Sequence, residues 1–200
     1  ESNPGYWGPR PIFDRLVVKV IPDPNTRVIA LQTGEIDLVY GAAGQIPSEA
    51  LVRLRDMAPN FAAAVSPPLA TRGLAMNSAR FPTDDRAVRL AINHAVDKDP
   101  LVRTVLDGIE PRADFLFAPR VPYADVGLKR YGFDRDADSR MLDAVGWTLG
   151  RDGVRAKDGR RLAVEVDFVG TNAPQRARAA GLQADLGRGG IDVRLIAEEV

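Results

Sequence analysis

The C-terminal part of the sequence constrains the fold more than any other stretch. In residues 162–169 (LAVEVDFV), apolar side chains recur at every second position, which is the pattern of a β-strand with one buried face. A helix is predicted over about 174–188, and a second strand over 191–197. Two strands joined by a helix pair in parallel, with a right-handed crossover in almost all proteins. We therefore predict a βαβ unit and an α/β fold.

The preceding sequence adds further helices and strands to this unit. Strands are predicted at 13–21 and 36–40, and helices that begin near Pro24, Ser48, Asp84, Pro100 and Asp134. The two prolines that follow Val65-Ser66 favour extended backbone and mark the best internal boundary. A long irregular segment is expected over 109–133, and a polar turn over 148–161.

Composition excludes several classes of function. Lys+Arg and Asp+Glu both number 27, so the formal net charge is zero and we predict no nucleic-acid partner. The absence of cysteine excludes disulfides, thiolate nucleophiles and Cys-ligated zinc. No apolar stretch approaches the roughly 18 residues that a membrane-spanning helix needs.

Motifs for catalysis, phosphate binding and metal binding are absent as well. The sequence holds one histidine, His94, and no G-x-S-x-G or glycine-rich phosphate loop. On a helical wheel His94 falls between Leu90 and Ala87, on a second apolar flank, so we interpret it as a half-buried packing residue. The adjacent carboxylates at 84–85 and 198–199 diverge and do not converge on a cation. We predict that the chain is not an enzyme, and we assign it no metal ligand and no cofactor.

Several runs, taken in order, resemble one protein family. They are Tyr6-Trp7-Gly8, Asp23 with Arg27, GEIDL (34–38), LAMN (74–77), DDRAVRLAINHAVDKDPLV (84–102) and DRDADSRMLDAVGW (134–147). Together they resemble family 5 solute-binding proteins, which serve peptide, dipeptide and nickel ABC importers. The ordered set spans essentially the whole sequence.

The resemblance implies a fold and a domain organisation. The family fold has two α/β lobes joined by crossover strands, and its chains are more than twice this long. The expected fold class is therefore α/β, a fragment of a two-lobed periplasmic binding protein (type II, family 5). Residues 1–70 would be the C-terminal part of lobe I, 71–77 the interlobe crossover, and 78–200 the N-terminal part of lobe II. Lobes cut in this way leave apolar faces bare, so we expect the chain to self-associate.

Within the family, nickel-binding periplasmic members are the most similar, over 65–85, 113–129, 166–175 and 192–199. This implies capture of nickel, as a chelate, outside the cytoplasm and delivery to the membrane permease of an ABC importer. The implied location is periplasmic, or extracellular on a membrane-anchored lipoprotein in a Gram-positive organism. The alternative within the family is a peptide, dipeptide or opine binder, and the alternative outside it is a cytosolic α/β enzyme.

The resemblance also carries over a set of positions that line the ligand cleft. They are Tyr40, Gly41 and Ala42 at the end of a lobe I strand, and Pro68, Thr71, Arg72 and Gly73 at the crossover. A guanidinium beside a cleft suits a ligand carboxylate, although Arg72 could equally be a solvated residue at the end of a strand. His94 stands where nickel-type members usually have tyrosine, so it is not assigned as a nickel ligand.

Overall fold

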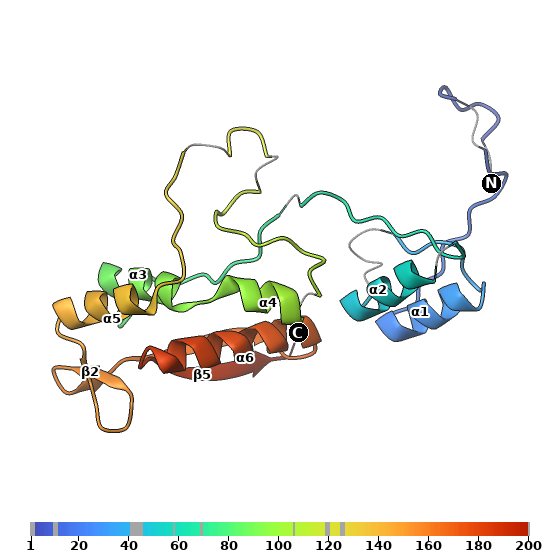
Figure 1. Ribbon diagram of the computed structural model, residues 1–200. Helices are drawn as coiled ribbons and strands as arrows, with labels where there is room; N and C mark the ends of the chain where they lie inside the picture. The colour runs from blue at the N-terminus through green and yellow to red at the C-terminus, as the bar shows by residue number, and fades with distance from the viewer. Residues whose placement is uncertain are drawn as a thin grey trace. The chain divides into compact units, whose positions relative to one another are not determined.

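The computed structural model describes residues 3–9, 12–40, 46–57, 59–68, 70–105, 107–118, 121–124 and 127–199 (Figure 1). The chain divides into two compact units, Glu1–Ala63 and Ala64–Val200. The division into lobe I, crossover and lobe II remains a prediction.

The predicted βαβ unit forms the end of the second unit. Strands β4 (Ala163–Val169) and β5 (Asp192–Glu198) pair in parallel, with Ala163 opposite Asp192 and Val169 opposite Glu198. Helix α6 (Ala173–Arg188) connects them and packs against both strands (Figure 1). The side chain of Asn172 caps the helix by accepting a hydrogen bond from the backbone N–H of Gln175 at 2.9 Å. The prediction is confirmed, and each element lies within one residue of its predicted bounds.

Three further helices complete the second unit: α3 (Arg86–Ala95), α4 (Lys98–Val105) and α5 (Arg135–Ala144). The carboxylate of Asp85 caps α3 by accepting the backbone N–H of Ala87 at 2.8 Å. Asp134 caps α5 through the N–H of Ala137 at 2.9 Å. Sequence and structure agree here because an N-cap aspartate and an apolar stripe are local signals.

One apolar core joins these elements. Helix α3 packs against α5, and both contribute to a cluster that includes the strands. Its buried members are Val88, Ala91, Ile92, Ala95, Leu142, Trp147, Leu162, Val166, Leu186, Ile191 and Val193. Burial of each valine, leucine or isoleucine side chain among them contributes about 1.5–3 kcal/mol, which fixes the helices on the sheet.

The segment predicted as a polar turn is a small antiparallel sheet, so that prediction is wrong. Strands β1 (Thr148–Leu149), β2 (Arg155–Lys157) and β3 (Arg160–Arg161) lie in sequence order. Strands of two or three residues carry no readable alternation of polarity. The turn that joins β2 to β3 could have been found, because Asp158 and Gly159 both have positive φ, as an Asp-Gly hairpin turn requires.

A buried arginine attaches this sheet to the core. Arg155 on β2 is 5% exposed, and its Nε donates a hydrogen bond to the carbonyl of Gly189 at 3.0 Å. Its Nη1 donates to the carbonyl of Trp147 at 2.8 Å and to the carboxylate of Asp143. The guanidinium therefore joins β2 to the C-terminal ends of α5 and α6.

The first unit holds α1 (Pro24–Gln32) and α2 (Ser48–Asp56). The predicted strands 13–21 and 36–40 do not form, since their described residues lie in no β-ladder. Leu16, Val18 and Val20, which the alternation placed on a buried face, are 77%, 81% and 88% exposed. A strand needs a partner for its backbone groups, and the described residues supply none.

Among the described residues, no helix is both long enough and apolar enough to cross a membrane.

The exposed segment that contains Leu16 and Val18 generates the first prediction. The 200-residue chain is expected to self-associate as its concentration rises, because apolar side chains in a segment without a partner are covered by another chain. Sedimentation velocity over a concentration series measures this. The double variant Leu16→Lys/Val18→Lys is expected to shift the equilibrium toward monomer, whereas Leu128→Lys, at an exposed position of the second unit, is the control. A compact monomer at every concentration would contradict the prediction.

A buried carboxylate on α5 gives a second prediction. Asp138 is 1% exposed, and neither of its oxygens has a hydrogen-bond partner of normal geometry in the described structure. Burial raises its pKa, and the nearby Ser139 and Arg155 offset this only in part. Because the folded-state pKa is raised, the wild type loses stability as the pH rises above the unfolded-state value.

Asp138→Asn is therefore expected to raise the free energy of unfolding at about pH 7, where the buried wild-type carboxyl is driven to ionise. It is expected to have less effect at about pH 4. Urea denaturation at the two pH values measures the difference. Asp136→Asn, at an exposed position on the same helix, is the control. An equal effect of Asp138→Asn at both pH values would show that desolvation of the charge is not the cause.

Candidate functional site

The predicted cleft residues are distributed over both units. Tyr40 belongs to the first unit and is 87% exposed, whereas Gly41 and Ala42 lie outside the described residues. Thr71 is half-buried in the second unit. Pro68, Arg72 and Gly73 are exposed there. Their role as a cleft wall stays a prediction.

Arg72 already has a partner. Its Nη1 donates to both carboxylate oxygens of Glu110, which lies in the irregular segment after α4. Both side chains are about half exposed, so solvent screens the pair and the carboxylate can be exchanged for another. Sequence reasoning identified Arg72 but missed Glu110, because the two residues are far apart in the sequence and no local pattern connects them.

A second arginine belongs to the same cluster. Arg178 on α6 is half-buried, and burial together with the positive charge of Arg72 lowers its pKa, while Glu110 acts in the opposite direction. Two guanidinium groups thus lie within electrostatic range of one carboxylate, to which Arg72 is hydrogen-bonded. This arrangement carries one excess positive charge and can accept an anionic group.

No protein metal centre accompanies this cluster. Within the described ranges, no group of three or more His, Asp or Glu side chains could hold a metal ion. His94 on α3 is half-buried, with Nδ1 2.7 Å from the carbonyl oxygen of Gly132 and its ring edge-on to Tyr131. Its surroundings agree with the predicted packing role.

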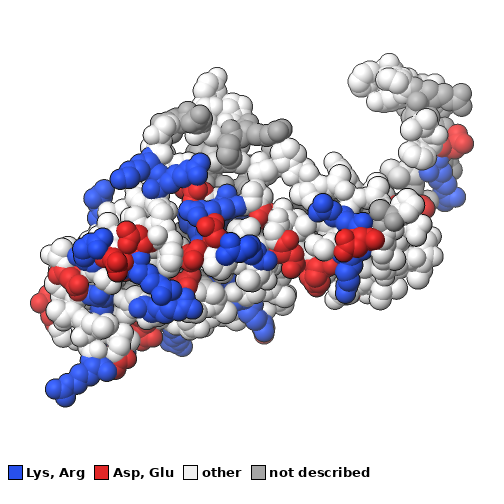
Figure 2. All heavy atoms as spheres, in the orientation of Figure 1, with Lys and Arg blue, Asp and Glu red and all other residues white. Residues whose placement is uncertain are grey.

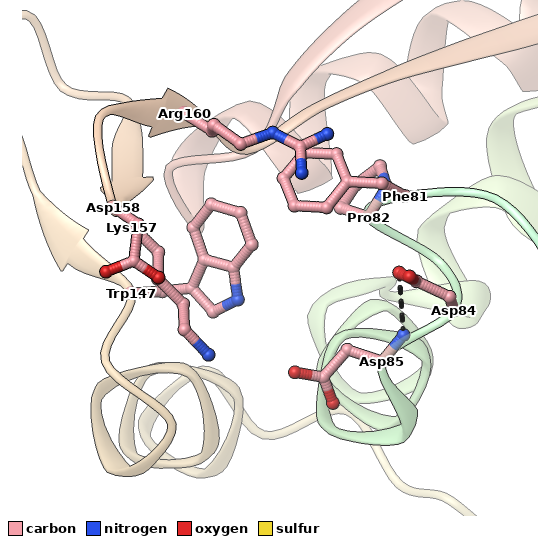
Figure 3. A pocket seen from close by; sticks show the side chains of 8 residues that line it. All are labelled: Phe81, Pro82, Asp84, Asp85, Trp147, Lys157, Asp158 and Arg160. Atoms are coloured by element: carbon pink, nitrogen blue, oxygen red, sulfur yellow. Dashed lines mark hydrogen bonds between the residues drawn. The ribbon is translucent and has the colours of Figure 1, made fainter.

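A separate hollow of about 290 Å³ lies between the turn before α3 and the β1–β3 sheet (Figure 3). Its lining residues are Phe81, Pro82, Asp84, Asp85, Trp147, Lys157, Asp158 and Arg160. Sequence reasoning missed it, since it took Asp84 as a helix start and residues 148–161 as a polar turn. The hollow depends on the hairpin, which the sequence pattern did not predict.

Surface charge is mixed. Figure 2 shows Lys and Arg side chains interleaved with Asp and Glu over the face in view. Ion pairs such as Lys98–Asp114 at 3.6 Å and Arg194–Glu165 at 3.3 Å join neighbours of opposite sign. A polyanion would need a continuous basic surface, and this face offers none.

Comparison with known proteins decides the family. Residues 1–199 match the family described as "Bacterial extracellular solute-binding proteins, family 5 Middle". The chain belongs to this family. The expected family and the expected fold class, a fragment of a two-lobed periplasmic binding protein, are confirmed. The prediction that the chain is not an enzyme is confirmed too, since its relatives are solute-binding proteins.

Three relatives illustrate the similarity. The chain is 43% identical over 199 residues, 98% of its length, to the nickel-binding periplasmic protein of Escherichia coli, of which it covers 38%. The structure of NikA from Brucella suis in complex with Fe(III)-EDTA matches with a TM-score of 0.91 and 51% identity, over 97% of this chain and 39% of that one. The oligopeptide-binding protein AppA of Bacillus subtilis is 26% identical over 200 residues, 97% of this chain and 35% of AppA.

The chain therefore spans about two fifths of the length of these relatives.

The surroundings of His94 generate a prediction for this site. His94→Tyr removes the hydrogen bond to Gly132, so it is expected to lower the free energy of unfolding by about 0.5–1.5 kcal/mol. Because His94 is engaged with Gly132 and Tyr131, nickel-chelate binding by the protein expressed with the sequence that flanks this chain in its genome is expected to change by less than about twofold. Urea denaturation and calorimetric titration with a nickel chelate measure the two quantities. Loss of nickel binding with the fold intact would make His94 a ligand.

Proposed function

We propose that this chain is part of the substrate-binding component of an ABC importer that captures nickel, as a chelate, outside the cytoplasm. The observation that carries the proposal is the 43% identity to a nickel-binding periplasmic protein, maintained over 98% of the chain. The match to NikA, whose structure holds a metal chelate, supports the same ligand class.

The donor chemistry of the chain favours a chelate over a bare ion. Nickel in proteins prefers nitrogen ligands, and the chain has one imidazole and no thiol. That imidazole is engaged with Gly132. A chelator brings its own donors, and the carboxylates that remain on it need cationic partners.

Arg72 is the residue that we assign to those carboxylates. A guanidinium can hold a carboxylate by charge-assisted hydrogen bonds, and in this structure the Nη1 of Arg72 donates to both carboxylate oxygens of Glu110. A ligand carboxylate would take the place of Glu110, and Arg178 would contribute the second positive charge. Glu110 then serves as the counter-ion of Arg72 when no ligand is bound.

The remaining parts of the proposal follow from the family. Ligand bound between two lobes favours the closed state, and the closed protein delivers its cargo to the membrane permease. Nickel is cargo here and not a cofactor. The location is periplasmic or extracellular, and the remaining six cleft positions, 40–42, 68, 71 and 73, would line the cleft with Arg72.

A peptide is the second candidate ligand. The similarity to AppA supports it, at 26% identity. A peptide C-terminus is also a carboxylate, so Arg72 would serve either ligand. The two candidate ligands differ in whether binding requires the metal ion.

Calorimetry on the protein expressed with the sequence that flanks this chain in its genome tests the proposal. A nickel–citrate complex is expected to bind with a dissociation constant in the micromolar range or tighter, about −8 kcal/mol, and to outcompete a tripeptide. Arg72→Ala is expected to weaken binding by about tenfold or more, since a charge-assisted hydrogen bond contributes about 1.5–3 kcal/mol. Glu110→Gln, which removes the competing carboxylate, is expected to strengthen it.

Arg130→Ala, at an exposed arginine outside the cluster, is the control and is expected to leave the isotherm unchanged. The 200-residue chain alone is expected to bind no better than about millimolar, because enclosure by both lobes is absent. Preference for the tripeptide over nickel–citrate would overturn the nickel assignment. Equal isotherms for Arg72→Ala and wild type would remove Arg72 from the site.

A further inference from the structure

The hollow between the turn before α3 and the β1–β3 sheet has the construction of a small binding site. Its floor is formed by buried Trp147 and Pro82, its walls include the half-buried Asp85 and Lys157, and its rim is exposed. Its volume, about 290 Å³, lies at the lower end of small-molecule sites. All of its residues belong to the second unit.

One wall offers hydrogen-bond donors without acceptors. The indole Nε1 of Trp147 is buried and has no partner in the described structure, although Trp147 is only 2% exposed. Figure 3 shows this nitrogen and the amino group of Lys157 directed into the hollow. Lys157 forms no ion pair or hydrogen bond with the described residues. A buried N–H without an acceptor destabilises the folded state, so a ligand that supplies a hydrogen-bond acceptor at this wall would be stabilised.

The opposite wall has two carboxylates, and each of them has one oxygen that accepts no hydrogen bond from the part of the chain that the structure describes. One oxygen of Asp84 accepts the backbone N–H of Asp85 at 3.0 Å, and one oxygen of Asp85 accepts the N–H of Ala87 at 2.8 Å. The second oxygen of each carboxylate has no donor among the described residues. No ion pair of the described residues crosses the hollow, although Figure 3 shows Lys157 and Asp85 on facing sides.

Aromatic rings line part of the space between the two walls. The rings of Phe81 and Trp147 lie 5.7 Å apart, centroid to centroid, with 40° between their planes. The guanidinium of Arg160 covers the ring of Phe81 at 3.3 Å. Arg160 is thereby engaged on the rim, and an aliphatic group can pack against the part of the Phe81 ring that stays exposed.

We propose that this hollow binds a free α-amino acid with an apolar side chain. Its carboxylate accepts hydrogen bonds from Trp147 and Lys157, its ammonium group donates to Asp84 and Asp85, and its side chain contacts the ring of Phe81. The lining residues carry two positive and three negative charges, so a bound zwitterion leaves the net charge of the hollow unchanged. A simple carboxylate would meet the carboxylates at 84 and 85, and a simple amine would leave the donors unpaired. The site is distinct from the Arg72 cluster and does not rest on the nickel assignment.

Two-dimensional ¹H–¹⁵N NMR of the 200-residue chain tests the proposal, because its two tryptophans give two indole signals. Titration with L-leucine is expected to shift the Trp147 indole signal saturably, with a dissociation constant of about a millimolar. The signal of Trp7, which is 91% exposed, is expected to stay in place. 3-Methylbutylamine and 4-methylpentanoate, which each lack one charged group of leucine, are expected to bind about tenfold more weakly or worse.

Matched variants locate the site. Lys157→Gln and Asp85→Asn are each expected to weaken leucine binding by about tenfold, since each removes one charged contact. Asparagine retains the N-cap acceptor, so Asp85→Asn keeps α3 capped. Lys129→Gln and Asp134→Asn, the latter at the equivalent cap of α5, are the controls and are expected to bind as the wild type does.

An absent or non-saturating shift of the Trp147 signal would overturn the proposal. So would equal binding of 4-methylpentanoate or 3-methylbutylamine, or leucine binding that Lys157→Gln and Asp85→Asn do not weaken. Circular dichroism of each variant confirms that the fold is retained.

Discussion

The guanidinium of Arg155 is the interaction on which the second unit depends. It is a buried cation whose hydrogen bonds run to the carbonyls of Trp147 and Gly189 and to the carboxylate of Asp143. Helix C-termini carry partial negative charge, and a cation placed beside the ends of α5 and α6 neutralises it. A buried charge without these partners would be strongly destabilising, so the contacts hold the β1–β3 sheet, α5 and α6 in one arrangement. The hollow lined by Trp147 and Lys157 exists only because this sheet is held there.

The sequence predicted the elements whose signals are local. The strands of the βαβ unit have period-two alternation, and α3 and α5 have aspartate caps followed by apolar stripes. Prediction failed where structure depends on distant partners. Residues 13–21 alternate as a strand does, but the described residues provide no neighbouring strand, and so they form no ladder. The β1–β3 strands are too short for a pattern, and only the Asp158-Gly159 turn could have indicated them.

The candidate sites divide in the same way. Arg72 was identifiable from its place in a family pattern. Its ion-pair partner Glu110 and the neighbouring cation Arg178 lie near it only because of the tertiary fold. The predicted packing role of His94 agrees with its contacts, since an apolar flank of a helix can be read from spacing alone. The hollow was not predictable, because its donors lie on Trp147 and β2 and its acceptors lie in the turn before α3, more than sixty residues earlier in the sequence.

The geometry around Gly190 has a consequence for how this sequence can diverge. Gly190 has φ of 82°, and a Cβ there would lie 2.9 Å from Cγ of Arg155 and 2.9 Å from Cδ1 of Leu149. Any side chain at 190 would be strained by its backbone and would displace the buried cation as well. Positions 155 and 190 are therefore expected to covary across the family. A relative that loses the arginine is released from one of these two close contacts, whereas the contact with Leu149 and the positive φ still favour glycine.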